Sequence, residues 1–450
     1  MKESLLQKKS SAFICELQNG LVLRRAITED ADELSEFNVR VQSNDPDEPV
    51  TWIGLWTKDL LSGNHPTTGP DDFTVVVDPR QEGKIVSTSA LISQTWRYED
   101  ISFGVGRPEL IGTDENYRRR GLAPTQMDVI HEWSRERDQL IQVITGVPFY
   151  YRRFGYEMAL DLGGSRLFPL DRLRKLKAPA EDDLQVRRAS AADLSILQDL
   201  YDRHCEASMV CRVRDAAQWH YEMFVANEHT SYHRRFYLVE TGDRDQVAGY
   251  FTISTHPGHV TIREIAAAPG HSLRAVALRA SRHLRDCYSG DGGDGKDARR
   301  SLAFALGQDH PAYRALEREL VPYADPYAWY VRVPDIRRFL GTIRPVLERR
   351  LEEGVMAGYS GSVRLNCTSD SVRMVWEKGK LVAIEEYEPV LFEDGDAIFP
   401  GRTFLQLLFG FRNLKELKRA HPDCYVQSDE AYVLLSTLLP RKPSLPVGLI

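Results

Sequence analysis

The stretch ELIGTDENYRRRGLAPTQMDVIHEW, residues 109–133, places three successive arginines between a predicted strand and a predicted helix. RPELIGT at 107–113 indicates the strand, and apolar residues at helical spacing after residue 121 indicate the helix. Three adjacent arginines on their own are typical of a solvated charged face. Their position before a helix gives a second interpretation, because the first N–H groups of a helix have no partner and carry partial positive charge.

The residues around the arginines are suited to bind a pyrophosphate group. Gly121 and Ala123 keep bulky side chains away from the start of the helix, so phosphates can approach its N–H groups. The arginines add positive charge and forked hydrogen bonds to phosphate oxygens. Pro124 fits an early position of the helix. The sequence therefore predicts a phosphate-bearing ligand at this junction.

A second motif follows downstream. In GVPFYYRRFGYEMAL, residues 146–160, Tyr151 stands three intervening residues ahead of the glycine–aromatic pair Gly155 and Tyr156. Arg-x-x-Gly-x-Ala after a strand resembles motif A of the GNAT N-acetyltransferases, which bind the pyrophosphate of acetyl-CoA there. The stretch around Tyr151 resembles the closing motif of the same family. The two motifs in this order resemble one GNAT active site.

The resemblance extends over nearly the whole chain. A GNAT half, a second half without motif A, and a last part that contains LLFGFRNLKEL at 407–417 together resemble the enhanced intracellular survival (Eis) type of GNAT enzyme, whose final domain is sterol-carrier-like. This resemblance implies one active site per chain, acetyl-CoA as co-substrate and no metal. The cofactor-binding residues that it implies are Ile111, Gly112, Thr113, Arg118, Arg119, Arg120, Gly121, Leu122, Ala123, Pro124, Gly146 and Val147.

A repeat predicts two related halves. LVLRRAITED at 21–30 and LQVRRASAAD at 184–193 share a Leu, an aliphatic residue, Arg-Arg-Ala and, after three further residues, an Asp. Each reads as a strand that runs into a helix, with Thr28 or Ser190 as the N-cap. Ser190 and Asp193 also have capping-box spacing. AAAPGHSLRA at 266–275 replaces the arginine-rich loop in the second half, which is therefore expected to be structural.

The remaining patterns predict an α/β (α+β) fold with helices behind mixed sheets. Runs of β-branched and aromatic residues predict strands at 72–78, 84–96, 101–105, 107–113, 139–146, 234–241, 246–255 and 259–268, with a helix at 272–284. The last part predicts an antiparallel meander over 360–387 and apolar helices at 403–417 and 429–439. We predict a catalytic GNAT domain at 1–168, a degenerate GNAT-like domain at 169–334 and a sterol-carrier-like domain at 335–450.

Composition excludes several classes of protein. Hydrophobic residues make up 42% and charged residues 27%, as in ordinary globular chains, and the net charge of -7 argues against a general nucleic-acid binder. No apolar run approaches the roughly 18 residues of a membrane helix, and the start lacks the apolar core of a signal peptide. Six scattered cysteines favour reduced thiols. We expect a cytoplasmic protein that neither inserts into a membrane nor binds nucleic acid.

GDGGDGK at 290–296 matches the spacing of a dinucleotide-binding loop but is predicted to be an acidic loop. Its aspartates would repel phosphate, and Asp297 stands where a P-loop needs a magnesium-binding Ser or Thr. No metal-binding pattern is evident either.

The resemblance implies direct transfer of the acetyl group of acetyl-CoA to a primary amine, with Tyr151 protonating the departing thiolate. Three bases could take the proton of the amine: the terminal carboxylate of Ile450, Glu109 or a water molecule. The amine itself is open among aminoglycosides, polyamines and lysines. The alternative function is a non-catalytic acyl-CoA sensor or lipid-binding protein. Family members of this type are hexamers, so the resemblance also implies a homo-oligomer.

The acceptor side has its own candidates. Five acids close to tryptophans in the sequence suit a polycationic amine, by Coulomb attraction and cation–π contact. They are Asp45, Asp47, Glu48, Asp71 and Asp72. The alternative is that they are solvated acids of surface loops.

Overall fold

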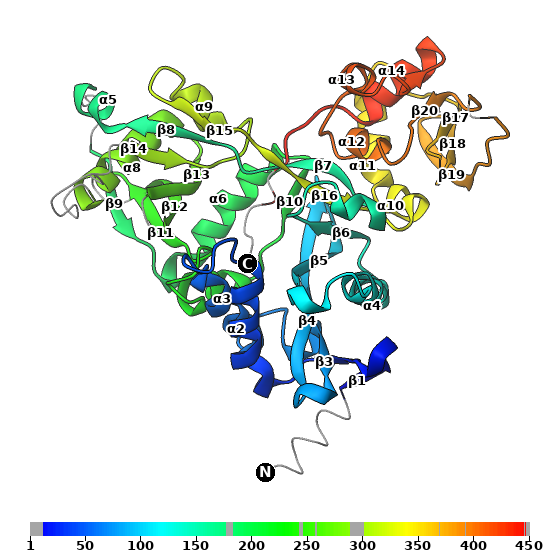
Figure 1. Cartoon of the computed structure of the whole chain (residues 1–450). Helices are drawn as coiled ribbons and strands as arrows, with labels where there is room; N and C mark the ends of the chain where they lie inside the picture. Colours follow the sequence, from blue (N-terminus) through cyan, green and yellow to red (C-terminus); the bar gives the residue numbers. More distant parts are fainter. Residues whose placement is uncertain are drawn as a thin grey trace.

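The computed structural model describes residues 12–176, 183–242, 246–256, 259–288, 301–368, 370–391, 393–444 and 446. The mixed α/β architecture is confirmed: three sheets, each flanked by helices, succeed one another along the chain. Figure 1 shows the first sheet in the centre, the second on one side of it and the C-terminal sheet on the other. GDGGDGK at 290–296 lies outside the described residues.

The first unit is built on a nine-stranded sheet. Its strands, in spatial order, are β1 (Phe13–Glu16), β2 (Val22–Arg25), β3 (Phe73–Asp78), β4 (Lys84–Tyr98), β5 (Ile101–Thr113), β6 (Ile141–Ile144), β16 (Tyr327–Arg332) and β7 (Glu157–Leu162), and β10 (Val210–Arg212) pairs with β4. The helices are α2 (Ala31–Gln42), α3 (Thr51–Leu61) and α4 (Leu122–Glu136). In Figure 1, α2 and α3 lie on one face of the sheet and α4 on the other. Every residue of β3 is consequently buried, which explains its unbroken apolar run.

The second unit is built on a seven-stranded sheet. Its strands, in spatial order, are β15 (Val321–Ala324), β8 (Ser165–Pro169), β14 (Ser301–Phe304), β13 (His259–Ala267), β12 (Val247–His256), β11 (Arg235–Glu240) and β9 (Gln185–Arg188). Its helices are α5 (Leu170–Lys175), α6 (Leu194–Glu206), α7 (Ala216–His220), α8 (Leu273–Tyr288) and α9 (Pro311–Ala315). In both units, one parallel pair of strands is joined by only two residue pairs, β5 with β6 and β13 with β14.

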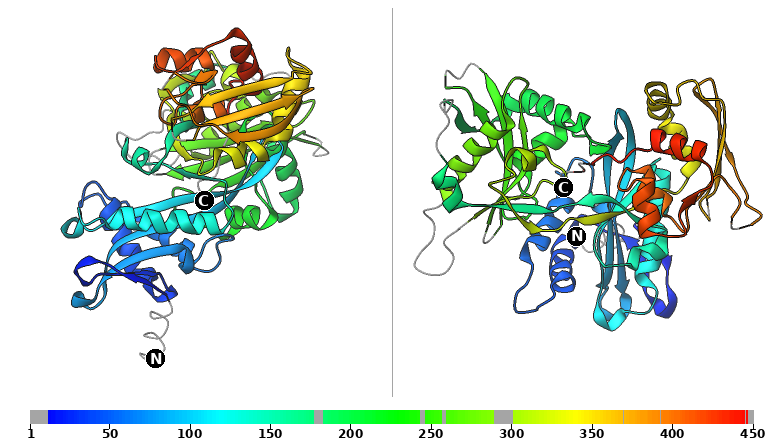
Figure 2. Two further views of the ribbon diagram at one scale, coloured as in Figure 1. Left: turned by 90° about the vertical axis from the view of Figure 1, so that its right-hand side faces the viewer. Right: turned by 90° about the horizontal axis from the view of Figure 1, so that it is seen from above.

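The C-terminal unit contains the predicted meander. Its five strands, in spatial order, are β19 (Lys380–Glu386), β18 (Val372–Glu377), β17 (Gly361–Asn366), β20 (Ala397–Ile398) and β21 (Tyr425–Val426). Its helices are α10 (Ile336–Thr342), α11 (Arg344–Glu353), α12 (Phe404–Leu408), α13 (Leu414–Ala420) and α14 (Asp429–Leu438). The unit packs against the first sheet, as the views in Figure 2 show, and the Tyr98 hydroxyl donates to the carbonyl oxygen of Leu408 at 2.8 Å.

The repeat seen in the sequence is a repeat of structure. Arg24 pairs with Asp30 at 2.6 Å in the first unit, and Arg187 pairs with Asp193 at 2.7 Å in the second. The same carboxylates also accept backbone N–H bonds, from Ile27 at 2.8 Å and from Ser190 at 2.7 Å. Each arginine thus ties the end of a strand to the start of the following helix.

Three local predictions were wrong. Residues 101–105 and 107–113 form one strand, β5, because Gly106 pairs with Ser93 of β4 and the ladder continues through it; the strand has a bulge at Leu110, which takes a left-handed φ of 51°. Thr28 is the first residue of a short 3-10 turn and not its cap, whereas Ser190 is the cap as predicted. The predicted helix over 403–417 is two short helices, α12 and α13, because Gly410 has a φ of 64° between them.

Three strands do not follow the predicted domain boundaries. β8 spans the predicted boundary at residue 169 but belongs to the second sheet. β10 and β16 lie in the predicted second domain but belong to the first sheet. β16 lies between β6 and β7, where the first sheet would otherwise be split, and it pairs antiparallel with both. The last strand of the second half therefore completes the sheet of the first.

Candidate active site

The site begins where two parallel strands separate. Among the described residues, β5 and β6 pair only through Val105 with Ile141 and Gly106 with Gln142. β5 continues to Thr113 in partnership with β4 alone, so its other edge is open along the predicted cofactor residues. Such a gap offers backbone groups to an extended ligand in the way that a missing strand would.

The end of β5 is fixed by neighbouring side chains. The Gln42 side chain donates to the carbonyl oxygen of Ile111 at 3.1 Å, and the Ser87 hydroxyl donates to that of Gly112 at 2.8 Å. A Cβ atom on Gly112 would lie 2.6 Å from a methyl group of Val41, so only glycine allows α2 to approach this closely. The Thr113 hydroxyl lies 2.8 Å from that of Ser87.

The loop after β5 is fixed to the sheet by Tyr117 and has open space next to Gly121. Tyr117 is buried and its hydroxyl donates to Asp78 at 2.8 Å, which holds the loop to the end of β3. Arg119 and Gly121 take left-handed φ values of 62° and 77°. No side chain caps the N-terminus of α4, and a Cβ built on Gly121 would have no atom within 4 Å. Helical N–H groups therefore face open space beside a glycine, which is the geometry of a phosphate site.

The three arginines have different surroundings. The Arg118 side chain donates to the carbonyl oxygen of Thr113 at 3.3 Å. Arg120 donates to the carbonyl oxygen of Asn116 at 2.9 Å and lies over the Tyr117 ring, so it is folded back onto the loop. All three are exposed, and none forms a salt bridge with a described carboxylate.

The other loop residues contribute through the backbone. Leu122 is buried against Tyr117 and Leu21, so this residue can offer only its main chain to a ligand. Ala123 and Pro124 are half-buried at the start of α4.

Tyr151 lies close to the end of the gap. It is 6% exposed and packs against Met127, Tyr156 and Tyr330. A Cβ built on Gly146 would lie 3.7 Å from its hydroxyl, and this hydroxyl forms no hydrogen bond with a described residue. Burial, with the negative charge of Glu109 as a second cause, raises the pKa of Tyr151 well above its usual range. The phenol is therefore protonated at any physiological pH.

Two tyrosines of β16, which the sequence analysis missed, hold the loop that carries Tyr151. The Tyr327 hydroxyl donates to the carbonyl oxygen of Gly146 at 3.2 Å, and the N–H of Phe149 donates to the Tyr330 hydroxyl at 2.7 Å. Val147, between these two points, is 58% exposed. The only signal in the sequence was the aromatic strand YAWYVR at 327–332, whose pairing with β6 and β7 could not be anticipated from its place in the chain.

Residues 24–159 match the model of the family described as "Acetyltransferase (GNAT) domain". The first unit therefore contains a segment that matches a GNAT acetyltransferase domain. No curated protein has a sequence that matches this chain.

Solved structures match the fold over almost the full length. A GCN5-related N-acetyltransferase from Kribbella flavida has a TM-score of 0.64 and 19% identity, with 94% of this chain and 97% of that chain covered. A GCN5-related N-acetyltransferase from Anabaena variabilis ATCC 29413 has a TM-score of 0.65 and 16% identity, with 95% of this chain and 98% of that chain covered. Eis1 from Mycobacterium abscessus has a TM-score of 0.61 and 15% identity, with 95% of this chain and 99% of that chain covered. These likenesses establish a shared three-unit fold.

Opposite the predicted cofactor loop, the GNAT domain has an aromatic wall that the second unit completes. Trp52 and Trp56 of α3 lie with ring centroids 5.3 Å and 4.6 Å from that of Tyr232, which follows α7 in the second unit. We call Trp52, Trp56 and Tyr232 the aromatic wall. Burial, together with the negative charge of Glu109, raises the pKa of Tyr232 to about 12.

The negative charge of Glu109 reaches both Tyr151 and Tyr232, because it is a cause of the raised pKa of each. The buried Arg107 guanidinium donates twice to Glu109, at 3.0 Å and 2.6 Å, and both bonds go to Oε1. Oε2 is not used by either bond, and the Glu109 side chain is 15% exposed. Two bonds from one guanidinium therefore hold this carboxylate through Oε1.

The five acids predicted for the acceptor side differ in their surroundings. Asp72 pairs with Arg137 at 2.6 Å, and the carbonyl oxygen of Asp71 accepts a hydrogen bond from the Arg25 side chain. Both residues therefore bind neighbouring arginines of the protein itself. Asp45, Asp47 and Glu48 lie on an exposed turn before α3. Asp72 in particular is not a free anion, which removes it as a partner for a cationic substrate.

Ile450, predicted as the carrier of a catalytic carboxylate, lies outside the described residues. The described part of the tail is held firmly: the N–H of Met209 donates to the carbonyl oxygen of Pro443 at 2.6 Å, and Lys442 pairs with Glu99 at 2.9 Å. Within the described ranges, no group of three or more His, Cys, Asp or Glu residues could hold a metal ion. The helices of the described chain include none that is both long and apolar enough to cross a bilayer.

Proposed function

We propose that this protein is an N-acetyltransferase that moves the acetyl group of acetyl-CoA to a primary amine by direct attack. The observation that carries the proposal is the position of Tyr151. A buried phenol without a hydrogen-bond partner among the described residues lies beside Gly146, at the end of the gap between β5 and β6. A sensor that only binds acyl-CoA needs no proton donor at this point.

Acetyl-CoA would lie in the gap between the strands. The pyrophosphate would accept hydrogen bonds from the N–H groups at the start of α4, with Arg118 and Arg119 as counter-charges. The pantetheine arm would follow the open edge of β5 from Thr113 to Ile111. Gly146 and Val147 would flank its far end, which places the thioester next to Tyr151.

The reaction needs two proton transfers. The nitrogen lone pair attacks the thioester carbonyl carbon, the C–S bond breaks, and the sulfur leaves as a thiolate. The raised pKa of Tyr151 keeps a proton on its hydroxyl until the thiolate forms, and the thiolate then takes that proton. We infer that Glu109 receives the proton of the ammonium group through Oε2, directly or through one water molecule.

Trp52 and Tyr232, the half-buried members of the aromatic wall, would bind the acceptor as a cation, with the buried Trp56 behind them. Ring faces attract ammonium groups, and the negative charge of Glu109 acts on Tyr232. Only one such site is proposed per chain. In the second unit, no arginine occurs between β13 and α8, and Arg274 at the start of α8 is paired with Glu319 at 2.5 Å. The proposed sterol-carrier-like nature of the C-terminal unit plays no part in this chemistry.

A panel of amines tests the function directly. The purified protein is mixed with acetyl-CoA and with spermidine, an aminoglycoside, a lysine-containing peptide or propylamine, and the release of thiol is followed. We expect release with at least one polycationic amine and little with propylamine. Tight binding of acetyl-CoA without release from any amine would favour the sensor instead.

A further inference from the structure

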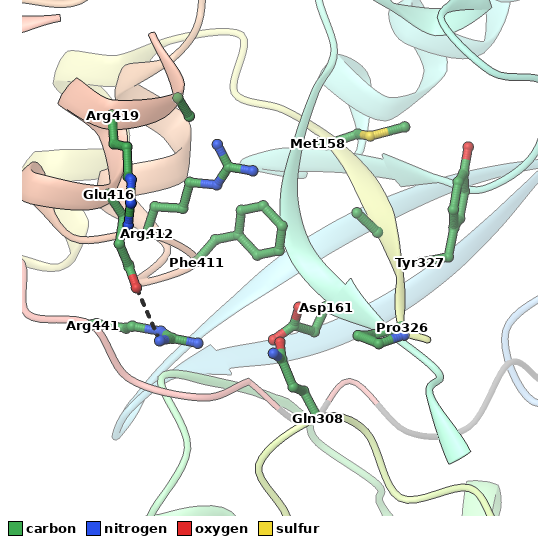
Figure 3. A pocket seen from close by; sticks show the side chains of 12 residues that line it. Met158, Asp161, Gln308, Pro326, Tyr327, Phe411, Arg412, Glu416, Arg419 and Arg441 are labelled. Atoms are coloured by element: carbon green, nitrogen blue, oxygen red, sulfur yellow. Dashed lines mark hydrogen bonds and ion pairs between the residues drawn. The ribbon is translucent and has the colours of Figure 1, made fainter. Parts of the chain in front are cut away.

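A pocket of about 550 Å³ lies where the three units meet. Its walls come from β7, the start of β16, helix α13 and the tail residue Arg441. Its volume is within the range of small-molecule sites. None of the residues that we assign to acetyl-CoA lines it, so it is distinct from the gap between β5 and β6. Figure 3 shows Arg412 and Phe411 projecting from the C-terminal unit toward the strands that carry Met158 and Tyr327.

The pocket has more positive than negative charge. Arg441 is bound to Glu416 at 3.1 Å and to Asp309 at 3.6 Å, so its positive charge is already engaged by two carboxylates. Arg412 and Arg419 form no salt bridge within the part of the chain that the structure describes. Arg412 is half-buried, and a guanidinium that has lost water without gaining a counter-charge favours the binding of an anion.

The acidic residues of the pocket do not cancel these charges. Glu416 is already paired with Arg441, as the dashed line in Figure 3 marks. Asp161 is held in a place that disfavours its charge: burial, and then the nearby carboxylate of Asp309, raise its pKa. Arg412 and Arg419 are therefore the two guanidinium groups of the lining that have no carboxylate partner among the described residues, and they can pair with the anionic group of a ligand.

The rest of the lining is apolar or aromatic. Phe411 and Tyr327 present rings, and Met158 and Pro326 add apolar surface. Gln308 offers an amide that can donate or accept. A ligand that fits this lining combines an anionic group with a flat or apolar body.

We propose that this pocket binds a small organic anion, a phosphate ester or carboxylate that carries an aromatic body. The anionic group lies between Arg412 and Arg419. The body packs against Phe411 and Tyr327.

The pocket is coupled to the proposed acetyl-CoA site through one side chain. The ring of Tyr327 lines the pocket, and its hydroxyl donates to the carbonyl oxygen of Gly146 at 3.2 Å. A ligand that packs against this ring changes how firmly Gly146 is held. Occupancy of the pocket therefore changes the affinity for coenzyme A, and the reverse effect is of equal size.

Phenyl phosphate serves as the probe, because it has both a charged group and a ring. Calorimetry is done on the full chain saturated with coenzyme A, so that the phosphate-binding loop before α4 is occupied. We expect saturable binding, and weaker binding of inorganic phosphate and of phenol. Arg412→Gln with Arg419→Gln should weaken phenyl phosphate binding by roughly tenfold to hundredfold, since bonds to a charged group are lost. Lys415→Gln, an exposed cation of α13 outside this pocket, is the control and should bind normally.

The coupling has its own variant. Tyr327→Phe keeps the ring but removes the hydroxyl, so phenyl phosphate should still bind while its effect on coenzyme A affinity disappears. If the double arginine variant is not folded, Arg419→Gln alone decides, because Arg419 is exposed. Absence of binding with coenzyme A present, or equal binding by the arginine variants, overturns the site. Acetyl transfer is not measured, so neither result depends on the proposed function.

Discussion

The hydroxyl of Tyr327 donates a hydrogen bond to the carbonyl oxygen of Gly146 at 3.2 Å, although 181 residues separate the two in the chain. The whole second unit lies between them in sequence, yet β16 returns to pair with β6 and β7. The loop that carries Tyr151 is thus fixed by hydrogen bonds from β16, a strand that follows the second unit in the sequence. Folding of the second unit and geometry of the first site are therefore linked.

Removal of the Tyr330 hydroxyl should loosen this loop. Tyr330→Phe leaves the N–H of Phe149 without its acceptor, and Phe149 has a left-handed φ of 61° that needs support. We expect kcat to fall roughly fivefold to tenfold, in line with about 1 kcal/mol of lost positioning, while KM for acetyl-CoA changes less. Steady-state kinetics measures the split. A fall in stability without any change in kcat would show that Tyr330 serves the fold alone.

Tyr151→Phe tests the proton donor. The change removes a hydroxyl that has no hydrogen-bond partner among the described residues, so the melting temperature should hardly move. Loss of a general acid should lower kcat by about 10²–10⁴-fold. Affinity for acetyl-CoA, measured by calorimetry, should be retained.

Two neighbours provide controls for Tyr151. Tyr150→Phe should keep near-normal turnover, because no hydrogen bond of its hydroxyl to a described residue is lost. Tyr156→Phe breaks a 2.9 Å bond to His131 and should cost stability of about 1 kcal/mol with a smaller loss of rate. Normal turnover by Tyr151→Phe would remove the assignment.

The sequence predicted those features that depend on local pattern. The arginine–glycine loop, the strand before it and the helix after it follow from turn chemistry and helical periodicity, and Ser190 with Asp193 follows from capping. The partners of β16 and β8 could not be predicted, because the sequence around a strand does not indicate which distant strand it will pair with. The same reason hid Tyr327, Tyr330 and Tyr232 from the candidate site. Asp72 was misjudged because its partner Arg137 is distant in sequence.

Gly121→Glu should abolish binding of acetyl-CoA. The new side chain would extend into the open space before α4 and place a negative charge where the phosphates bind. Gly270→Glu is the matched control: Gly270 has a φ of 83° against 77° for Gly121, lies shortly before α8 and also has open space at its Cβ. Both variants carry the same strain of about 1–2 kcal/mol. Calorimetry with acetyl-CoA should separate them, and equal loss by both would mean that strain alone is responsible.

Glu99→Gln should loosen the described tail. Burial acts to raise the pKa of Glu99, but hydrogen bonds from Arg350 and Lys442 outweigh it and lower the pKa to about 2. A lowered pKa means that the stabilisation is complete above the unfolded value of about 4.3 and is lost as pH falls toward 2. At pH 7 we expect the variant to lose about 1–3 kcal/mol of unfolding free energy.

The pH dependence isolates this carboxylate. Between about pH 5 and pH 3 the melting temperature of the unaltered protein should fall faster than that of Glu99→Gln, because only the former loses the ion pairs with Arg350 and Lys442. Glu377→Gln, an exposed acid of β18, is the control and should follow the unaltered protein. Parallel curves for all three proteins would mean that Glu99 does not anchor the tail.

The base for the amine can be identified with two changes. Glu109→Gln keeps the shape of the side chain and an oxygen for Arg107, but removes the ability to take a proton. If Glu109 is the base, kcat/KM should fall by about 10²–10⁴-fold and the acid limb of its pH profile should disappear. Addition of one glycine after Ile450 moves the terminal carboxylate by up to about 3.6 Å and leaves every side chain in place. That extended chain should then keep the activity and pH profile of the unaltered protein. The opposite pattern, with loss of activity on extension and little effect of Glu109→Gln, would assign the base to the carboxylate of Ile450.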